Sequence, residues 1–241
     1  MKTHLRAVLA LSALIALSGC QKVNDAFGQQ VRGYLLAHPE VLEEALQKLQ
    51  EKKQAEAAKA ALVGLSTYRR ELERDPRDFV ANPNGKITVV EFFDYRCGYC
   101  KLAAPEVVKL VQENPDIRFV FKEFPIFGGP SNAAAKVALS PQGKAKGMEL
   151  FNAFMADKTL DDAAIDRHLV AAGIDPAAAR AAGDGAEVQK HIADTRELAA
   201  KLAIEGTPAF IVGDRLVPGA DLPALRAAID EARRGPLKHP G

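Results

Sequence analysis

The chain of 241 residues has no tryptophan, only 6% aromatic residues and almost no net charge, with 32 Lys and Arg against 31 Asp and Glu. Its 14 Pro and 18 Gly are too few for a collagen-like or low-complexity chain. Nothing in the charge balance indicates a nucleic-acid partner. The 48% of hydrophobic residues instead predict a globular core, and the abundance of alanine indicates a helix-rich fold.

Cysteine is also scarce, because the chain has only Cys20, Cys97 and Cys100. The last two form a C-x-x-C motif, which is either a redox pair or half of a zinc site. A structural zinc needs four ligands, and the chain has no second C-x-x-C and only scattered histidines. A purely structural disulfide closing so short a loop would add little stability. We therefore expect a redox pair, with no metal and no cofactor.

The N-terminus has the parts of an export signal. A cationic start with Lys2 and Arg6 precedes an apolar run over 7–17 that is too short to stay in a membrane as a spanning helix. The run ends in Leu-Ser-Gly-Cys20, which resembles the lipobox of bacterial lipoproteins. That resemblance implies a signal peptide over 1–20, a lipid on Cys20 and a periplasmic protein anchored in a membrane, with Gln21 favouring the outer membrane. The alternative is ordinary cleavage after Ser18, which leaves Cys20 as a free thiol.

Residues 23–75 are predicted to be helical, with one break at Pro39. The second helix carries an apolar stripe at helical spacing: Val41, Leu42, Ala45, Leu46 and Leu49. A lone helix cannot bury this stripe. Periodicity alone leaves two options open, an oligomerisation stalk or a helix folded back on its own domain. We assign residues 21–55 to an N-terminal helical arm and 56–83 to a helical linker.

The redox pair lies between a predicted strand and a predicted helix. Residues 86–93 are β-branched, aromatic and mostly apolar, as in a buried central strand, and a helical pattern follows over 101–111. Cys97 would then sit at a helix N-terminus, where unpaired N–H groups and the charge of Arg96 favour the thiolate. We expect Cys97 to be the nucleophile and Cys100 to resolve the mixed disulfide.

The run over 90–101, with Pro105 beyond it, resembles the active-site segment of the thioredoxin superfamily and above all of DsbA-like proteins. This resemblance implies that Glu91 is a buried acid that relays the proton of Cys100. It also implies that Lys122, on the next predicted strand, neighbours this acid.

The second signature of that superfamily is a cis-proline that faces the disulfide, and the run over 206–212 resembles it. The resemblance implies that Thr207 and Pro208, with Gly98 and Tyr99, contact the substrate. It also implies an α/β fold of β-α-β, a helical insertion over about 130–204, and then β-β-α, within a domain over 84–240. The helices expected after the second strand cover 131–139, 144–155, 161–172, 176–182, 187–204 and 222–234.

The direction of the reaction is indicated by resemblance alone. Gly98 and Tyr99, with Thr207, resemble the combination in periplasmic disulfide isomerases, and residues 31–46 resemble the trimerising arm of suppressor-of-copper-sensitivity C proteins. We expect a disulfide isomerase or reductase of exported proteins, a trimer or dimer kept reduced by a membrane thiol reductase of the DsbD/ScsB type. The alternatives are a DsbA-like dithiol oxidase and a copper(I)-binding lipoprotein that uses Cys97 and Cys100 as ligands without turnover.

Overall fold

The computed structural model describes residues 19–235 and divides into two compact units, with the boundary between Ala58 and Lys59. The smaller unit contains α2 (Gly19–Ala37) and the first part of α3 (Glu40–Thr67). The break between these helices falls at Pro39, as predicted, because proline starts a helix but cannot continue one. The predicted signal peptide lies outside the described residues as far as residue 18.

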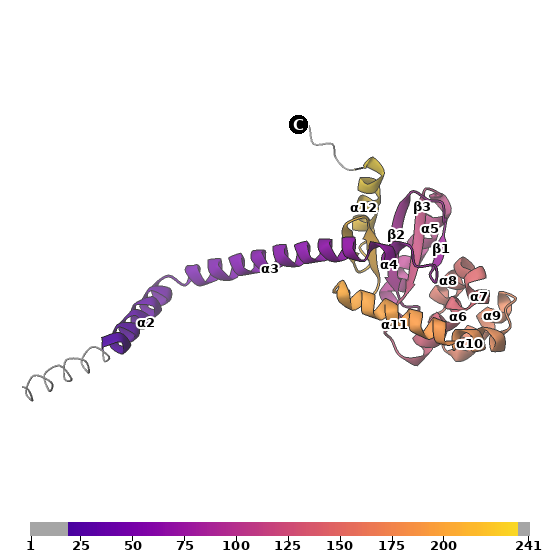
Figure 1. The fold of residues 1–241 in the computed structure, drawn as a ribbon, viewed down its shortest axis with the longest axis horizontal. Helices are drawn as coiled ribbons and strands as arrows, with labels where there is room; N and C mark the ends of the chain where they lie inside the picture. The colour runs from indigo at the N-terminus through magenta and orange to yellow at the C-terminus, as the bar shows by residue number, and fades with distance from the viewer. Residues whose placement is uncertain (1–18, 236–241) are drawn as a thin grey trace, which may run out of the picture. The chain divides into compact units, whose positions relative to one another are not determined.

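A five-stranded sheet forms the centre of the larger unit (Figure 1). Its strands are β1 (Phe79–Ala81), β2 (Ile87–Phe93), β3 (Ile117–Glu123), β4 (Ala209–Val212) and β5 (Arg215–Pro218), in the order β1-β3-β2-β4-β5. Strands β2 and β3 are parallel, and all other pairs are antiparallel. The expected β-α-β and β-β-α halves are therefore confirmed. The short strand β1 was not anticipated, since three residues carry too little periodicity to predict a strand.

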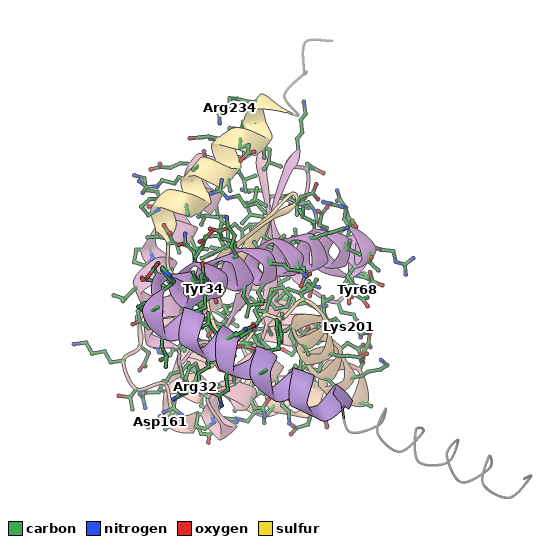
Figure 2. The ribbon with its side chains drawn as sticks, turned by 90° about the vertical axis from the view of Figure 1, so that its left-hand side faces the viewer. Arg32, Tyr34, Tyr68, Asp161, Lys201 and Arg234 are labelled. Carbon is green, nitrogen blue, oxygen red and sulfur yellow. The ribbon has the colours of Figure 1, made fainter. Side chains whose placement is uncertain are left out.

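Both faces of the sheet are covered by helices, which explains why β2 is apolar along most of its length. One face packs against α5 (Gly98–Glu113) and α12 (Leu222–Arg234), and the other against the end of α3, α4 (Arg69–Glu73) and α11 (Ala186–Lys201). Beside this second face, the Lys201 ammonium at the end of α11 lies 5.3 Å from the ring centroid of Tyr68 (Figure 2). Alternate residues of β2 consequently enter two separate cores.

The predicted helical insertion lies between β3 and β4 and, apart from α11, gathers beside the sheet (Figure 1). It consists of α6 (Gly129–Leu139), α7 (Pro141–Ala145), α8 (Gly147–Ala156), α9 (Asp162–Ala171), α10 (Pro176–Gly183) and α11. Two expectations need correction. The helix expected over 144–155 is split at Lys146, and the Cα of Gly147 packs so closely on the Phe79 ring that a Cβ would clash. Helix α11 ends at Lys201, three residues early, because Ala203 has a left-handed backbone with φ 53°.

Candidate active site

Cys97 lies at the N-cap of α5, four residues after the end of β2. Its backbone is extended, with φ −70° and ψ 122°, and its N–H donates to the carbonyl of Asp94 at 3.1 Å. Cys97 Sγ lies 3.2 Å from the Thr207 carbonyl oxygen, to which the thiol donates when it is protonated, and this contact joins the two sequence signatures although they are 110 residues apart. The sulfur is nearly covered, whereas the neighbouring Arg96 and Gly98 are exposed.

The pKa of Cys97 is lowered to about 5, in the direction that the sequence predicts. The largest cause is a hydrogen bond from the Cys100 thiol, and burial opposes it. The backbone N–H groups of Cys100 and Tyr99 lower the pKa further. The charge of Arg96, which was expected to favour the thiolate, is not among these main causes. At neutral pH Cys97 is therefore a thiolate, stabilised by local hydrogen bonds and not by a neighbouring cation.

Cys100 differs from Cys97 in every respect that matters for reactivity. It lies one helical turn further into α5 and is 0% exposed. Burial raises the pKa of its thiol, and its hydrogen bond to Cys97 and the charge of Glu91 raise this pKa further. Cys100 is thus a protonated thiol within hydrogen-bond reach of the Cys97 sulfur, and it must lose a proton before it can attack.

Glu91 is completely buried on the face of β2 that packs against α5, between its cross-strand neighbours Phe121 and Phe210. Neither carboxyl oxygen has a hydrogen-bond partner among the described residues. Burial raises the pKa of this carboxyl, and the charge of the Cys97 thiolate raises it further. The structure therefore places a carboxyl with a raised pKa in the core behind the two cysteines.

Lys122 is not brought together with Glu91, and this corrects the expectation from the resemblance. In the β2–β3 register Lys122 pairs with Phe92, whereas Glu91 pairs with Phe121, so the two side chains point to opposite faces of the sheet. The Lys122 ammonium is buried beneath α4 and donates to Asp78 Oδ2 at 2.6 Å and to the Glu71 carbonyl at 2.5 Å. It belongs to a buried ion-pair network and lies on the far side of the sheet from the cysteines.

The remaining predicted site residues lie around Cys97. The Thr207–Pro208 peptide bond is cis, as the resemblance implied. Tyr99 is 66% exposed, and Gly98 is exposed beside it at the start of α5. The side-chain oxygen of Thr207 is buried without a hydrogen-bond partner in the described structure. Their contacts with substrate stay a prediction.

Sequence reasoning missed two further buried acids. Asp94 is 1% exposed and accepts hydrogen bonds from four donors, and Glu123 is 5% exposed and accepts one from the Tyr95 hydroxyl at 2.8 Å. Burial raises the pKa of Glu123. A signal for Asp94 was available, because an Asp in the turn before a helix commonly accepts from the backbone N–H two residues later. The distant partners of both acids leave no such local pattern.

Within residues 19–235, no group of three or more His, Cys, Asp or Glu side chains is placed to hold a metal ion. None of the helices described there combines the length and the apolar character that crossing a bilayer requires.

A cysteine of lowered pKa at a helix N-terminus, a second and fully buried thiol, a buried acid and a nearby cis-proline are the combination of a thiol-disulfide oxidoreductase of the thioredoxin class. The profile of the DsbA-like thioredoxin domain matches residues 88–230, which is more than half of the chain. The protein therefore belongs to the DsbA-like thioredoxin family. A second profile, the N-terminal domain of the copper resistance protein ScsC, matches residues 24–56.

Individual relatives agree with this assignment. The thiol:disulfide interchange protein DsbA of Bordetella pertussis is 30% identical over 54% of this chain and 65% of its own length. Two other curated matches are Na(+)/H(+) antiporters NhaA of Salinispora arenicola and Salinispora tropica, and the chain spans only 26% and 25% of their length. The structure of Salmonella enterica Typhimurium BcfH is 32% identical with a TM-score of 0.72, covering 89% of this chain and 98% of that one. A linker-deletion mutant of Proteus mirabilis ScsC is 27% identical with a TM-score of 0.67, covering 85% and 92%.

Proposed function

We propose that this oxidoreductase is a disulfide isomerase or reductase of exported proteins in the periplasm. The observation that carries the redox chemistry is the asymmetry of the two cysteines, one a stabilised thiolate beside Thr207 and the other a buried thiol. The observation that favours isomerisation over oxidation is the N-terminal arm, because a shuffling enzyme gains from several active sites held around one client.

The reaction begins when the Cys97 thiolate attacks one sulfur of a client disulfide. An S–S bond forms between Cys97 and the client, the client S–S bond breaks, and the second client sulfur leaves as a thiolate. In isomerisation a different thiolate of the client attacks the client sulfur of the mixed disulfide, which forms a new client disulfide and releases Cys97 as a thiolate. In reduction Cys100 loses its proton and attacks the Cys97 sulfur, which releases a reduced client and leaves the pair as a disulfide. A membrane thiol reductase of the DsbD/ScsB type would then supply two electrons and one proton, which restores the Cys97 thiolate and the Cys100 thiol.

Glu91 is the group best placed to handle the proton of Cys100. It is a buried acid whose oxygens have no hydrogen-bond partner among the described residues. The charge of Cys97 raises the pKa of Glu91, and the charge of Glu91 raises the pKa of Cys100. As Cys97 loses its negative charge in the mixed disulfide, one cause of the raised pKa of Glu91 disappears. In the proposed step the carboxyl releases its own proton to solvent, and the carboxylate that results accepts the Cys100 proton as attack begins. Lys122 takes no part, because it lies behind the opposite face of the sheet.

The arm supports assembly into a homo-oligomer, a trimer or dimer. Leu42, Leu46 and Leu49 of the predicted stripe are 52%, 62% and 48% exposed in the single chain. Each would stabilise an interface by about 1.5–3 kcal/mol if fully buried there. The match of residues 24–56 to the ScsC N-terminal domain points to the same segment.

The cell envelope is the proposed site of action. One similar structure is of a periplasmic thioredoxin-like protein from Salmonella enterica, and the N-terminal sequence carries the predicted lipobox. Lipidation of Cys20 and an outer-membrane anchor remain predictions. Mass spectrometry of the N-terminal peptide from the native host tests both the cleavage site and the lipid, and an unmodified peptide that starts at Gly19 contradicts the anchor.

A DsbA-like oxidase is the second candidate, favoured by the pKa of about 5 at Cys97. A stable thiolate favours the reduced form of the pair and thus makes its disulfide more oxidising. Two metal-free measurements separate the candidates: the reduction potential in glutathione buffers, and the recovery of activity from scrambled ribonuclease A. If the protein is an isomerase, its reduced form should restore the activity of scrambled ribonuclease A. Deletion of residues 21–55 should then lower this recovery, although the shortened protein should still reduce insulin. A monomeric full-length protein without isomerase activity would favour the oxidase.

A further inference from the structure

Glu123 is a second buried acid on the face of the sheet that carries Glu91. In the parallel register it pairs with Phe93, and Glu91 lies two residues before Phe93 on β2, so the two carboxyl side chains leave the sheet on the same side. Glu123 is 5% exposed, and its Oε1 accepts a hydrogen bond from the Tyr95 hydroxyl at 2.8 Å. Nothing above gives this acid a role in the reaction.

The Tyr95 hydroxyl is held on Glu123 by the packing of its ring. Tyr95 is 3% exposed, and its ring meets those of Phe93 and Phe154 edge-on, with centroids 5.0 and 5.1 Å apart. Burial raises the pKa of Glu123, and the hydrogen bond from Tyr95 opposes this rise because it favours the charged carboxylate. The fold therefore supplies Glu123 with a donor that favours charge at a place where burial disfavours it.

Charge on Glu123 and charge on Glu91 disfavour one another. The charges of Asp94, Glu91 and Asp78 raise the pKa of Glu123 further. Asp78 is paired with Lys122, and Asp94 accepts from four donors, so each of these two acids has partners of its own. Because Coulomb repulsion is mutual, a charged Glu123 also favours the protonated form of Glu91. Two acids that interact in this way titrate as a coupled pair.

The two cysteines and Lys101 of α5 complete the surroundings of this pair. Burial and then the charge of Cys97 raise the pKa of Glu91, but that charge disappears when Cys97 enters the mixed disulfide. Cys100 is still a protonated thiol at that stage. Lys101 directs its ammonium to three carbonyls at the end of α8, those of residues 154, 155 and 157. In the mixed disulfide, Glu123 is therefore the coupled group whose charge bears on the proton of Glu91.

We infer that Glu123 is a positioning residue that keeps a proton on Glu91 and so delays the attack of Cys100 on the mixed disulfide. The two acids share one proton, and Tyr95 favours its location on Glu91. When that proton leaves to solvent, Glu91 accepts the Cys100 proton, the Cys97–Cys100 bond forms and the client leaves as a thiolate. The delay gives a client thiolate time to attack first, as isomerisation requires. The inference deepens the proposed function and rests on it.

The test measures how the rate of the resolving step depends on pH in the full-length protein. Stopped-flow release of a labelled peptide thiol from the Cys97 mixed disulfide reports this rate. Glu123→Gln removes the charge and keeps an acceptor for the hydroxyl, and Tyr95→Phe removes only the hydroxyl. Each should shift the acidic limb of the profile about one pH unit lower, so that release at about pH 6 is about tenfold faster. The recovery of scrambled ribonuclease A should fall at the same pH.

Two double variants show whether the effect passes through Glu91. Glu123→Gln should have no effect on the resolving rate when Glu91→Gln is present, and Tyr95→Phe should add nothing to Glu123→Gln. Ser140→Ala is the matched control, because it removes a buried hydrogen bond of the helical insertion, 2.7 Å long, without changing any charge. It should lower stability and leave the pH profile in place. Unshifted profiles, shifts to higher pH, or an equal effect of Glu123→Gln without the Glu91 carboxyl would overturn the inference.

A measurement on the unaltered protein covers the case in which the variants do not fold. In the oxidised full-length protein, carbon-13 NMR should show the carboxyl carbons of Glu91 and Glu123 titrating in the same two steps, because the acids share a proton. A single independent step for each would overturn the inference. A protein that neither reduces insulin nor restores scrambled ribonuclease A would instead refute the proposed function, whereas an active protein whose pH profile ignores Glu123→Gln would refute this inference alone.

Discussion

The two faces of the sheet bury ionisable groups in opposite ways. On the α5 face, Glu91 is 0% exposed and has no hydrogen-bond partner. On the other face, Lys122 is 1% exposed but meets Asp78, which also accepts from His191 Nε2 at 2.9 Å. A buried group without a partner has its neutral form favoured and is free to exchange a proton, whereas a paired group stays charged and supports the fold. We therefore expect the buried acid on the α5 face to take part in the redox chemistry and the buried ion pair on the other face to stabilise the fold.

The largest effect is expected from Lys122→Met. The change leaves the Asp78 carboxylate buried with only His191 as a partner, so we expect a loss of about 3–5 kcal/mol in the free energy of unfolding. Urea denaturation measures this loss. The redox chemistry of the protein that remains folded should be unchanged, because Lys122 does not reach the cysteines. A double variant with Asp78→Leu should recover part of the loss, and a stable Lys122→Met that resolves mixed disulfides slowly would break the comparison.

Glu91→Gln should, in contrast, slow a step of the redox chemistry. It removes the acid that is to accept the Cys100 proton, so the attack of Cys100 on a preformed Cys97 mixed disulfide should slow about 100-fold near pH 7. Stopped-flow release of a labelled peptide thiol measures this step. The formation of the mixed disulfide should be nearly unaffected, because Cys97 is already a thiolate. Equal slowing of both steps would argue that Glu91 only shapes the site.

The same substitution should change how the stability of the reduced protein depends on pH. Burial raises the pKa of Glu91 in the fold above the 4.5 of an exposed carboxyl. The unfolded chain therefore releases this proton first as pH rises. The contribution of Glu91 to stability is complete below about pH 4.5 and is lost as pH rises towards its folded pKa. Urea midpoints of the native protein should thus fall, relative to Glu91→Gln, between pH 4 and pH 8. Parallel curves would contradict a raised pKa.

The smallest effect is expected from Arg226→Ala, which tests burial against pairing. The Arg226–Glu106 ion pair joins α12 to α5 at 2.6 Å, the same distance as the Lys122–Asp78 pair. Arg226 is however 57% exposed, so water replaces the lost contact and the urea midpoint should hardly move. A loss comparable to that of Lys122→Met would mean that the distance between the charges, and not their burial, sets the cost.

Much of the fold and of the site was predictable because it is local. A β-branched run, a C-x-x-C and a helical pattern stand next to one another in the chain, so the nucleophile, the resolving thiol and the strand–helix context follow from residues 86–111. The proline break at Pro39 and most of the insertion helices follow in the same way from turn residues and apolar spacing.

What the sequence determined by itself is therefore the identity of the reactive pair and the class of fold. Only the tertiary structure decided which face each buried charge occupies, because side chains alternate along a strand and a register shift of one residue exchanges the faces. The positions of Glu91 and Lys122 in two neighbouring predicted strands do not show that their side chains lie on opposite faces of the sheet. Three of the four donors to Asp94 come from residues 126, 127 and 131, beyond an intervening helix and strand. Such contacts form only when the chain has folded, since no local periodicity encodes them.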